Sequence, residues 1–212
     1  FGTFFKNSFI VVLFCIIGNL LTCSMAAYAF ARLPFTGRNF WFALMFASLL
    51  LPHHVVLIPQ YILFDSLEWI NTYMPLIVPK FLASDAFFIF LMVQFIRGLP
   101  LELDQAAKVD GCNHIQIYGR IIVPLLLPAI VTTSIFTLIW TWNDFFSQLI
   151  YISDPRKLTV ALALRAFMDT MGQSAMGSLF AMSILSLIPI FVFFLVFQRW
   201  LIEGIATYGV KG

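Results

Sequence analysis

The chain has 212 residues, of which 61% are hydrophobic and 17% aromatic, while only 10% are charged. This much apolar surface is more than the core of a soluble protein of this size can hide, so the composition excludes a soluble globular domain. The formal net charge is only +2, and we expect no nucleic-acid partner. Apolar runs of roughly 20 residues favour spanning helices over the shorter alternating strands of a barrel. The sequence therefore predicts an all-α polytopic membrane protein.

Five apolar runs are long enough to cross a bilayer. They are Ser8 to Phe30, Phe40 to Phe64, Pro75 to Ile96, Ile121 to Trp142 and Met176 to Trp200. Lys and Arg gather after the first and third runs and in the tail, whereas Asp65 and Glu68 follow the second run. By the positive-inside rule, those basic links and the C-terminal tail (201–212) are cytoplasmic, and Phe1 lies outside. Because the chain starts with Phe and an odd number of spans separates its ends, we expect a sixth span upstream of Phe1.

The last external link, residues 151–175, is too polar to span a membrane. Within it, LTVALALRAF has apolar residues that either lie along the membrane surface or meet a partner. Of the three cysteines, Cys15 and Cys23 are separated by about 12 Å along one helix, so we expect no disulfide between them. No Cys or His spacing of the zinc type occurs, so we expect no metal site either.

The link after the third span, residues 99–120, has a pattern of its own. Apolar and small residues recur at helical spacing from Leu99 to Ala107, with polar residues between them, which predicts a short amphipathic helix. Gly111 then ends it, because glycine tolerates the left-handed conformation of a helix C-terminus. Residues 112–120 begin a second helix that continues into the next span. The prediction is a cytoplasmic elbow of two short helices.

Two interpretations of this elbow remain open on physical grounds. It is either a loop that packs against its own bundle or a docking lever for another protein. In the second case the small side chains of Ala106 and Ala107 would let a partner's backbone come close, and the rigid unit would transmit a push to the span that follows.

The elbow ELDQAAKVDG, followed by YGRIIVPLLLP, resembles the EAA loop of ATP-binding-cassette (ABC) importer permeases. Gln105 stands where the family often has the Glu of its Glu-Ala-Ala triplet, so a hydrogen-bonding group remains but a charge is lost. AAYAFARLPFTGR, LLPHHVVLIPQY, WTWNDFFSQLIY and FQRWLIEGIATYGVKG also resemble the carbohydrate branch of this family, close to the smaller permease of maltose-type transporters. Together these segments extend the resemblance through nearly the whole chain.

The resemblance implies a type I importer permease in a bacterial inner membrane. Its implied partners are a second permease, two cytoplasmic ATPase subunits seated on the elbows, and an extracytoplasmic binding protein that delivers an oligosaccharide. The implied coupling residues are Glu102, Asp104, Gln105, Ala106, Ala107, Asp110 and Gly111. ATP and Mg²⁺ would be bound by the ATPase subunits, since GIATYGVK near the C-terminus lacks the Gly-Lys-Ser/Thr of a phosphate loop. In the family the tail reaches the ATPase pair.

Polar and aromatic residues near the ends of spans are candidates for the substrate pathway. Trp140, Asn143 and Asp144 combine an aromatic face for sugar stacking with groups that bond hydroxyls. The alternative is an interfacial belt, with Trp and Tyr at headgroup level and Asp144 paired to an arginine. His53 and His54 either bond a carbonyl freed by Pro52 or contact substrate or protons.

Two other classes of function are alternatives to a sugar permease. A permease for amino acids or glycerol phosphate shares the elbow. An intramembrane enzyme or channel would have to use His53, His54 and Asp144, but the sequence has no Gly-x-Ser-x-Gly, HExxH or filter-like loop. We therefore expect a non-catalytic transport subunit.

Overall fold

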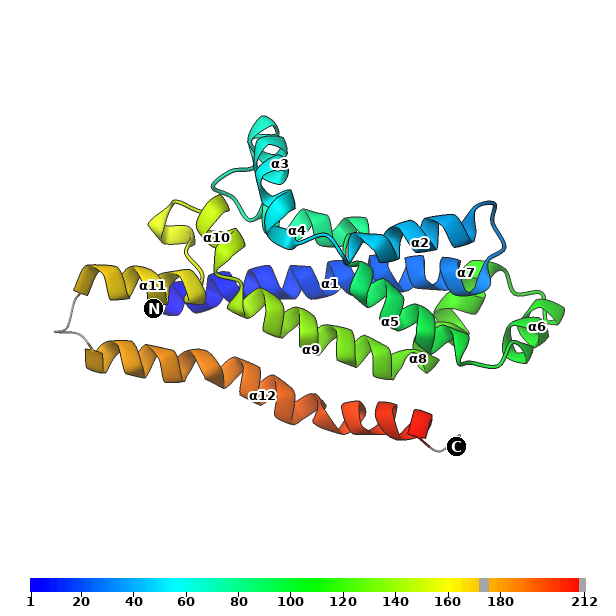
Figure 1. Cartoon of the computed structure of the whole chain (residues 1–212). Coiled ribbons are helices and arrows are strands. Elements are labelled where there is room, and N and C mark those ends of the chain that lie inside the picture. Colours follow the sequence, from blue (N-terminus) through cyan, green and yellow to red (C-terminus); the bar gives the residue numbers. More distant parts are fainter. Residues whose placement is uncertain (172–175, 210–212) are drawn as a thin grey trace.

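Helix α1 (Gly2–Arg32) runs through the centre of the molecule, and α5 and α9 pack beside it (Figure 1). The computed structural model describes residues 1–171 and 176–209, without the side chains of residues 53, 54, 169–171 and 200–209. All regular elements in this part of the chain are helical. From the amino end to the elbow they are α1, α2 (Arg38–Ser48), α3 (His53–Ser66), α4 (Met74–Ile77), the 3-10 helix η1 (Val78–Leu82) and α5 (Ala86–Arg97).

The second half begins with the elbow and ends with a long apolar helix. Its elements are α6 (Glu102–Val109), α7 (His114–Ile117), the π-helical η2 (Tyr118–Ile122), α8 (Val123–Leu125), α9 (Leu127–Asn143), α10 (Phe146–Tyr151), the 3-10 helix η3 (Pro155–Lys157), α11 (Val160–Met171) and α12 (Met176–Gly209). The elbow lies at the carboxyl end of α1, and α10 and α11 lie near its amino end (Figure 1). The predicted external link thus sits at the opposite end of the molecule from the elbow.

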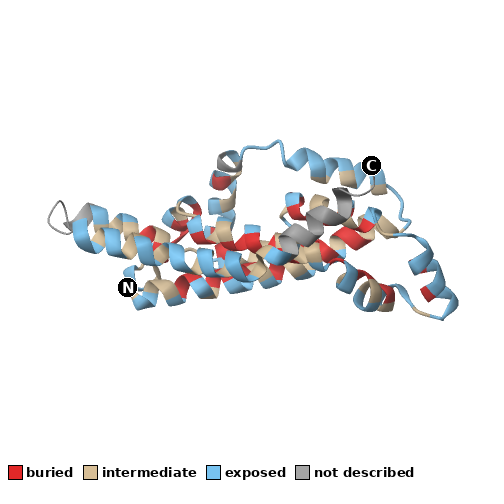
Figure 2. Ribbon diagram, turned by 90° about the horizontal axis from the view of Figure 1, so that it is seen from below, coloured by how far each residue is buried: buried red, intermediate tan, exposed pale blue. Residues whose placement is uncertain are grey.

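Buried side chains are concentrated where α1 meets α5 and α9 (Figure 2). Gly18 makes the closest approach there, because a Cβ atom at this position would lie 2.8 Å from the Phe81 ring and 3.0 Å from the carbonyl carbon of Lys80. Only glycine lets η1 come this near to α1. By contrast, no residue in the most apolar stretch of α12 is buried. That helix therefore leaves most of its apolar surface to lipid or to another subunit.

Four of the five predicted spans are found as helices of spanning length. Three are single stretches, Gly2–Arg32, Met74–Arg97 and Met176–Arg199, and the fourth is the pair His114–Leu125 and Leu127–Asn143, bent by 74°. The bend falls at Leu126, between Pro124 and Pro128, because each proline lacks the N–H that a continuous helix would use. The chain is thus a multi-pass membrane protein.

The prediction of one continuous second span from Phe40 to Phe64 is wrong. Residues 49–52 separate α2 from α3, and α3 stands away from the bundle (Figure 1). The helices have 11 and 14 residues, or about 16 and 21 Å, against roughly 30 Å of hydrocarbon. Pro52 explains the break, since its ring disfavours a helical conformation for Leu51 before it.

Candidate functional site: an elbow and a cavity at opposite ends of α1

The first arm of the elbow, α6, has one face against the bundle and one face exposed. Asp104 and Ala107, three residues apart, are 8% and 5% exposed, whereas Glu102, Gln105 and Ala106 are exposed. The prediction that both alanines can receive a partner's backbone is therefore wrong for Ala107, because the chain's own core covers it. Ala106 keeps an accessible small side chain. One face of α6 thus packs against the chain's own bundle, and docking by the exposed face stays a prediction.

The corner of the elbow is a tight helix end. Gly111 has a φ of 81°, which is the left-handed conformation expected from the sequence. Its N–H donates to the Lys108 carbonyl at 3.0 Å, and the Cys112 N–H donates to the Ala107 carbonyl at 2.9 Å. This pair of bonds is a Schellman motif, which satisfies the last carbonyls of α6. Asp110 precedes the glycine and is exposed.

The second arm begins with a capping box. The Asn113 side chain accepts from the Gln116 N–H at 2.9 Å, and the Gln116 side chain accepts from the Asn113 N–H at 2.8 Å. The helix then continues through η2 and α8 toward the membrane. Val109 and Ile115, one on each arm, are 88% and 80% exposed. The corner of the elbow therefore presents apolar side chains on a rigid frame.

A cavity of about 1040 Å³ lies beside the middle of α1, against Val11 and Cys15, where α3, η1, α5, α9 and α10 converge. Trp140, Asn143 and Asp144, the residues predicted for a substrate pathway, all line it. Asp144 also accepts a hydrogen bond from the Ser147 N–H at 3.1 Å, which fixes the turn between α9 and α10. The cavity wall thus brings together a carboxylate, an amide and a large aromatic ring.

Aromatic side chains form one side of this cavity. Trp140 is 49% exposed and stacks on Phe88 with ring centroids 5.2 Å apart. Phe87 lies beside it, with centroids 5.5 Å apart, and is 37% exposed. Trp142 points elsewhere, because it is only 3% exposed and its Nε1 donates to the Ser186 carbonyl. Exposed aromatic faces of this kind suit the C–H faces of sugar rings.

Polar side chains on the α10 side of the cavity differ in whether the protein satisfies them. Gln148 bonds the hydroxyl of Thr159 and the Thr141 carbonyl, so it links the segments around α10 to one another. Tyr151 also lines the cavity, and its buried hydroxyl has no hydrogen-bond partner among the residues described. Burial, followed by the negative charge of Asp144, raises the pKa of Tyr151, so the hydroxyl keeps its proton.

Sequence reasoning missed an ion pair in the cavity wall. Lys80 Nζ lies 3.0 and 2.9 Å from the two carboxylate oxygens of Asp85. Asn19 on α1 donates to Asp85 at 2.7 Å and to Thr137 on α9 at 3.1 Å. The group therefore ties three helical segments together at membrane depth. Its signal was present in the sequence as two opposite charges inside the apolar run Pro75 to Ile96.

Two further predictions fall outside what the structure describes. His53 and His54 form the first turn of α3, but their side chains are outside the described residues. The same holds for the tail, since α12 continues to Gly209 without described side chains from residue 200 onward, and residues 210–212 are not described. The roles proposed for these residues stay predictions.

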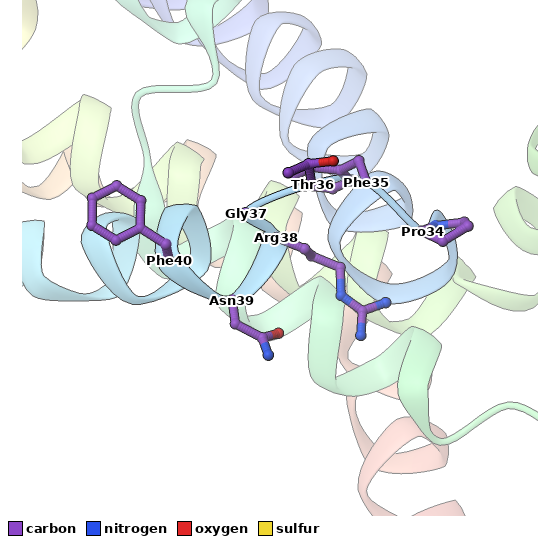
Figure 3. A pocket seen from close by; sticks show the side chains of 7 residues that line it. All are labelled: Pro34, Phe35, Thr36, Gly37, Arg38, Asn39 and Phe40. Atoms are coloured by element: carbon purple, nitrogen blue, oxygen red, sulfur yellow. The ribbon is translucent and has the colours of Figure 1, made fainter.

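The loop between α1 and α2 curves round a surface hollow of about 670 Å³ (Figure 3). Its lining consists of the successive residues 34–40, which form this loop and the first turn of α2, and the Arg38 and Asn39 side chains extend from that turn (Figure 3). No other segment contributes to this lining, so the hollow lacks the convergent groups of a binding site.

Comparison with known proteins shows the family to which this membrane chain belongs. Residues 8–207 match the family model described as binding-protein-dependent transport system inner membrane component. The chain belongs to this family. The permease is 34% identical, over all of its length and 75% of the relative's, to the arabinooligosaccharides transport system permease protein AraQ of Halalkalibacterium halodurans. It is 30% identical to the diacetylchitobiose uptake system permease protein DasC of Streptomyces coelicolor, again over its full length and 76% of the relative's.

A solved structure has the same fold as this permease. It is the crystal structure of a bacterial ABC transporter involved in the import of the acidic polysaccharide alginate. The similarity has a TM-score of 0.83 and covers 94% of this chain and 74% of the other, at 21% identity. The predicted importer permease fold is therefore confirmed.

Proposed function

We propose that this permease forms half of the pathway of an ATP-driven importer for a sugar or oligosaccharide. The observation that carries the proposal is the separation of two sites along α1, with an exposed apolar corner at its carboxyl end and a polar, aromatic cavity beside its middle. The names of AraQ and DasC, which transport arabinooligosaccharides and take up diacetylchitobiose, support the sugar class.

The cavity supplies groups suited to a sugar. Trp140 offers a ring face for stacking, and Asn143, Asp144 and the unpartnered Tyr151 hydroxyl can bond sugar hydroxyls. A neutral, hydroxyl-rich solute uses all of these contacts, whereas a glycerol phosphate or an amino acid requires a cation for its anionic group. Lys80 is the nearest cation in the described lining, and Asp85 already neutralises it.

The elbow supplies a docking surface for an ATPase subunit in the cytoplasm of a bacterium. Val109, Ile115 and Ala106 are exposed there, and Glu102 and Gln105 add polar contacts at the rim. The proposed complex contains a second permease, two such ATPase subunits, which bind the ATP and Mg²⁺, and an extracytoplasmic binding protein. Hydrolysis in the ATPase subunits would move the elbow and open the cavity to one side of the inner membrane at a time.

Reconstitution of the complex in lipid vesicles tests this proposal. The tagged permease should co-purify with ATPase subunits and a second permease, and vesicles supplied with ATP and the cognate binding protein should accumulate an oligosaccharide. Replacing both Val109 and Ile115 by Ser should release the ATPase subunits, whereas Phe35→Ser, an exposed apolar residue 39% accessible in a nearby loop, should not. Uptake of amino acids or glycerol phosphate in place of sugars would refute the sugar class, and a chain that purifies without ATPase subunits would refute the importer.

A further inference from the structure

One face of α1 holds both arms of the elbow. Ser24, Tyr28 and Arg32 are spaced four residues apart, so they lie in a row at the cytoplasmic end of the helix. The Ser24 and Tyr118 hydroxyls are 2.7 Å apart, and the Tyr28 hydroxyl lies 3.5 Å from His114 Nδ1. These contacts attach the second arm of the elbow to α1.

The third member of the row, Arg32, attaches the first arm. Its Nε lies 2.9 Å from Asp104 Oδ2 on α6, and its Nη2 donates to the Leu99 carbonyl at 2.8 Å. The side chains of Arg32 and Asp104 are only 5% and 11% exposed. One guanidinium therefore fixes both the entrance to the elbow and the inner face of α6.

A buried pair of this kind specifies position more than it stabilises the fold. Removing two charges from water costs free energy that their attraction offsets only in part, so a well-packed apolar pair would often be as stable. The other oxygen of Asp104, Oδ1, is buried without a hydrogen-bond partner in the described part of the chain. Arg32 Nε is likewise buried without a hydrogen bond, so the two groups meet as an ion pair, and Arg32 is the cation within ion-pair distance of this carboxylate in the described structure.

The middle of α1 lies against the cavity. Val11 and Cys15 line it, and Asn19 holds Asp85 of the cavity wall. The helix is continuous from Gly2 to Arg32 and is about 46 Å long. A movement imposed on its cytoplasmic end therefore reaches the cavity wall without crossing a break, whereas the span that follows the elbow bends by 74° on the way.

We propose that Arg32 is a positioning residue that locks the elbow to α1, so that displacement of the elbow by an ATPase subunit moves the cavity wall through α1. This inference rests on the proposed function, because it assigns a route to the coupling that the importer requires. The route is distinct from the direct continuation of the elbow into α9.

The accessibility of the cavity provides a readout that does not depend on knowing the sugar. Cys15, Cys23 and Cys112 are first replaced by Ser, and Asn143, an exposed residue of the lining, is replaced by Cys. A membrane-impermeant maleimide, added to the reconstituted complex with and without ATP and vanadate, then reports how far the cavity opens. With Arg32 present, nucleotide should change the labelling rate about fivefold or more, the size of a modest coupling between sites.

Arg32→Gln and Asp104→Asn should reduce this nucleotide response to less than about twofold while ATP hydrolysis and subunit composition remain. Arg32→Lys, which keeps the charge but loses the fork, should respond to an intermediate degree. Arg156→Gln is the matched control, because Arg156 pairs with Asp154 at 3.1 Å on the surface, with its own side chain 90% exposed. It should respond like the parent.

The remaining results distinguish failure of the role of Arg32 from failure of the proposed function. A full nucleotide response in Arg32→Gln overturns the positioning role, and so does loss of the ATPase subunits from Arg32→Gln, because the pair would then serve assembly. If the parent complex itself shows no nucleotide response, or contains no ATPase subunits, the proposed function fails and the role of Arg32 fails with it.

Discussion

Replacing Asp85 by a neutral residue should destabilise the permease, because Lys80 then loses its ion-pair partner. Asp85→Asn keeps the shape of the side chain and an acceptor for Asn19, but it removes the carboxylate that lies within ion-pair distance of Lys80. Breaking a fully buried ion pair by removing one partner costs about 3–5 kcal/mol. The Lys80 and Asp85 side chains are 28% and 24% exposed, so water retains part of the charge and we expect about 2 kcal/mol.

Thermal unfolding of the permease in lipid nanodiscs measures this effect. A loss of about 2 kcal/mol corresponds to a decrease in Tm of roughly 4–8 °C for a chain of this size. The double variant Lys80→Met with Asp85→Asn should recover most of the loss, since it removes the cation together with its partner. Asp65→Asn, an exposed carboxylate on α3, serves as the control and should melt like the parent. If Asp85→Asn is no less stable than the double variant, water already satisfies Lys80 and the reasoning is wrong.

Two other substitutions test the packing of α1 and the pathway. Gly18→Ala should cost about 1–3 kcal/mol, because its methyl group would meet the Phe81 ring and the backbone of η1, whereas Gly2→Ala in the same helix meets nothing within 4 Å and should melt unchanged. Equal melting temperatures for the two would contradict the close approach. Trp140→Ala should reduce oligosaccharide uptake about tenfold by removing a stacking surface worth roughly 1–2 kcal/mol, and normal uptake would exclude Trp140 from the pathway.

The elbow was predictable because its signals are local. A polar helix, an Asp-Gly corner and a second helix follow from residues 101–120 alone, and Gly111 adopts the expected φ. Which face of α6 would be buried was not predictable in the same way. That depends on residues of other helices, because Arg32 of α1 pairs with Asp104 and Ala107 packs into the core with Tyr28, while Ala106 stays exposed.

Hydropathy averaged over a run of residues does not detect the break in the second predicted span. Residues 40–64 are apolar enough to be counted as one helix, but Pro52 acts on the backbone of Leu51, and hydropathy does not register that effect. The same averaging concealed Lys80 and Asp85, because an apolar run tolerates two charges. Their pairing depends on the short turn of η1 and the start of α5, which brings the two side chains together.

The cavity was predictable in part. Trp140, Asn143 and Asp144 were chosen for their position at the end of a span, and all three line it. Trp142 lies on the other side of the same helix, since two residues correspond to about 200° of rotation. Helical geometry alone therefore separates the two tryptophans. The orphan hydroxyl of Tyr151 depends on the packing of α3 and α10 and has no counterpart in the sequence pattern.

The bend at Leu126 divides the fourth span into two halves that few backbone hydrogen bonds join. Pro124 and Pro128 have already removed the hydrogen bonds that would resist a change of angle there, while the Leu126 N–H still donates to the Ile122 carbonyl at 2.8 Å. A change of angle at this point therefore meets fewer backbone hydrogen bonds than it would in an unbroken helix. Replacing either proline by alanine should supply one more backbone N–H donor at the bend and make the joint stiffer.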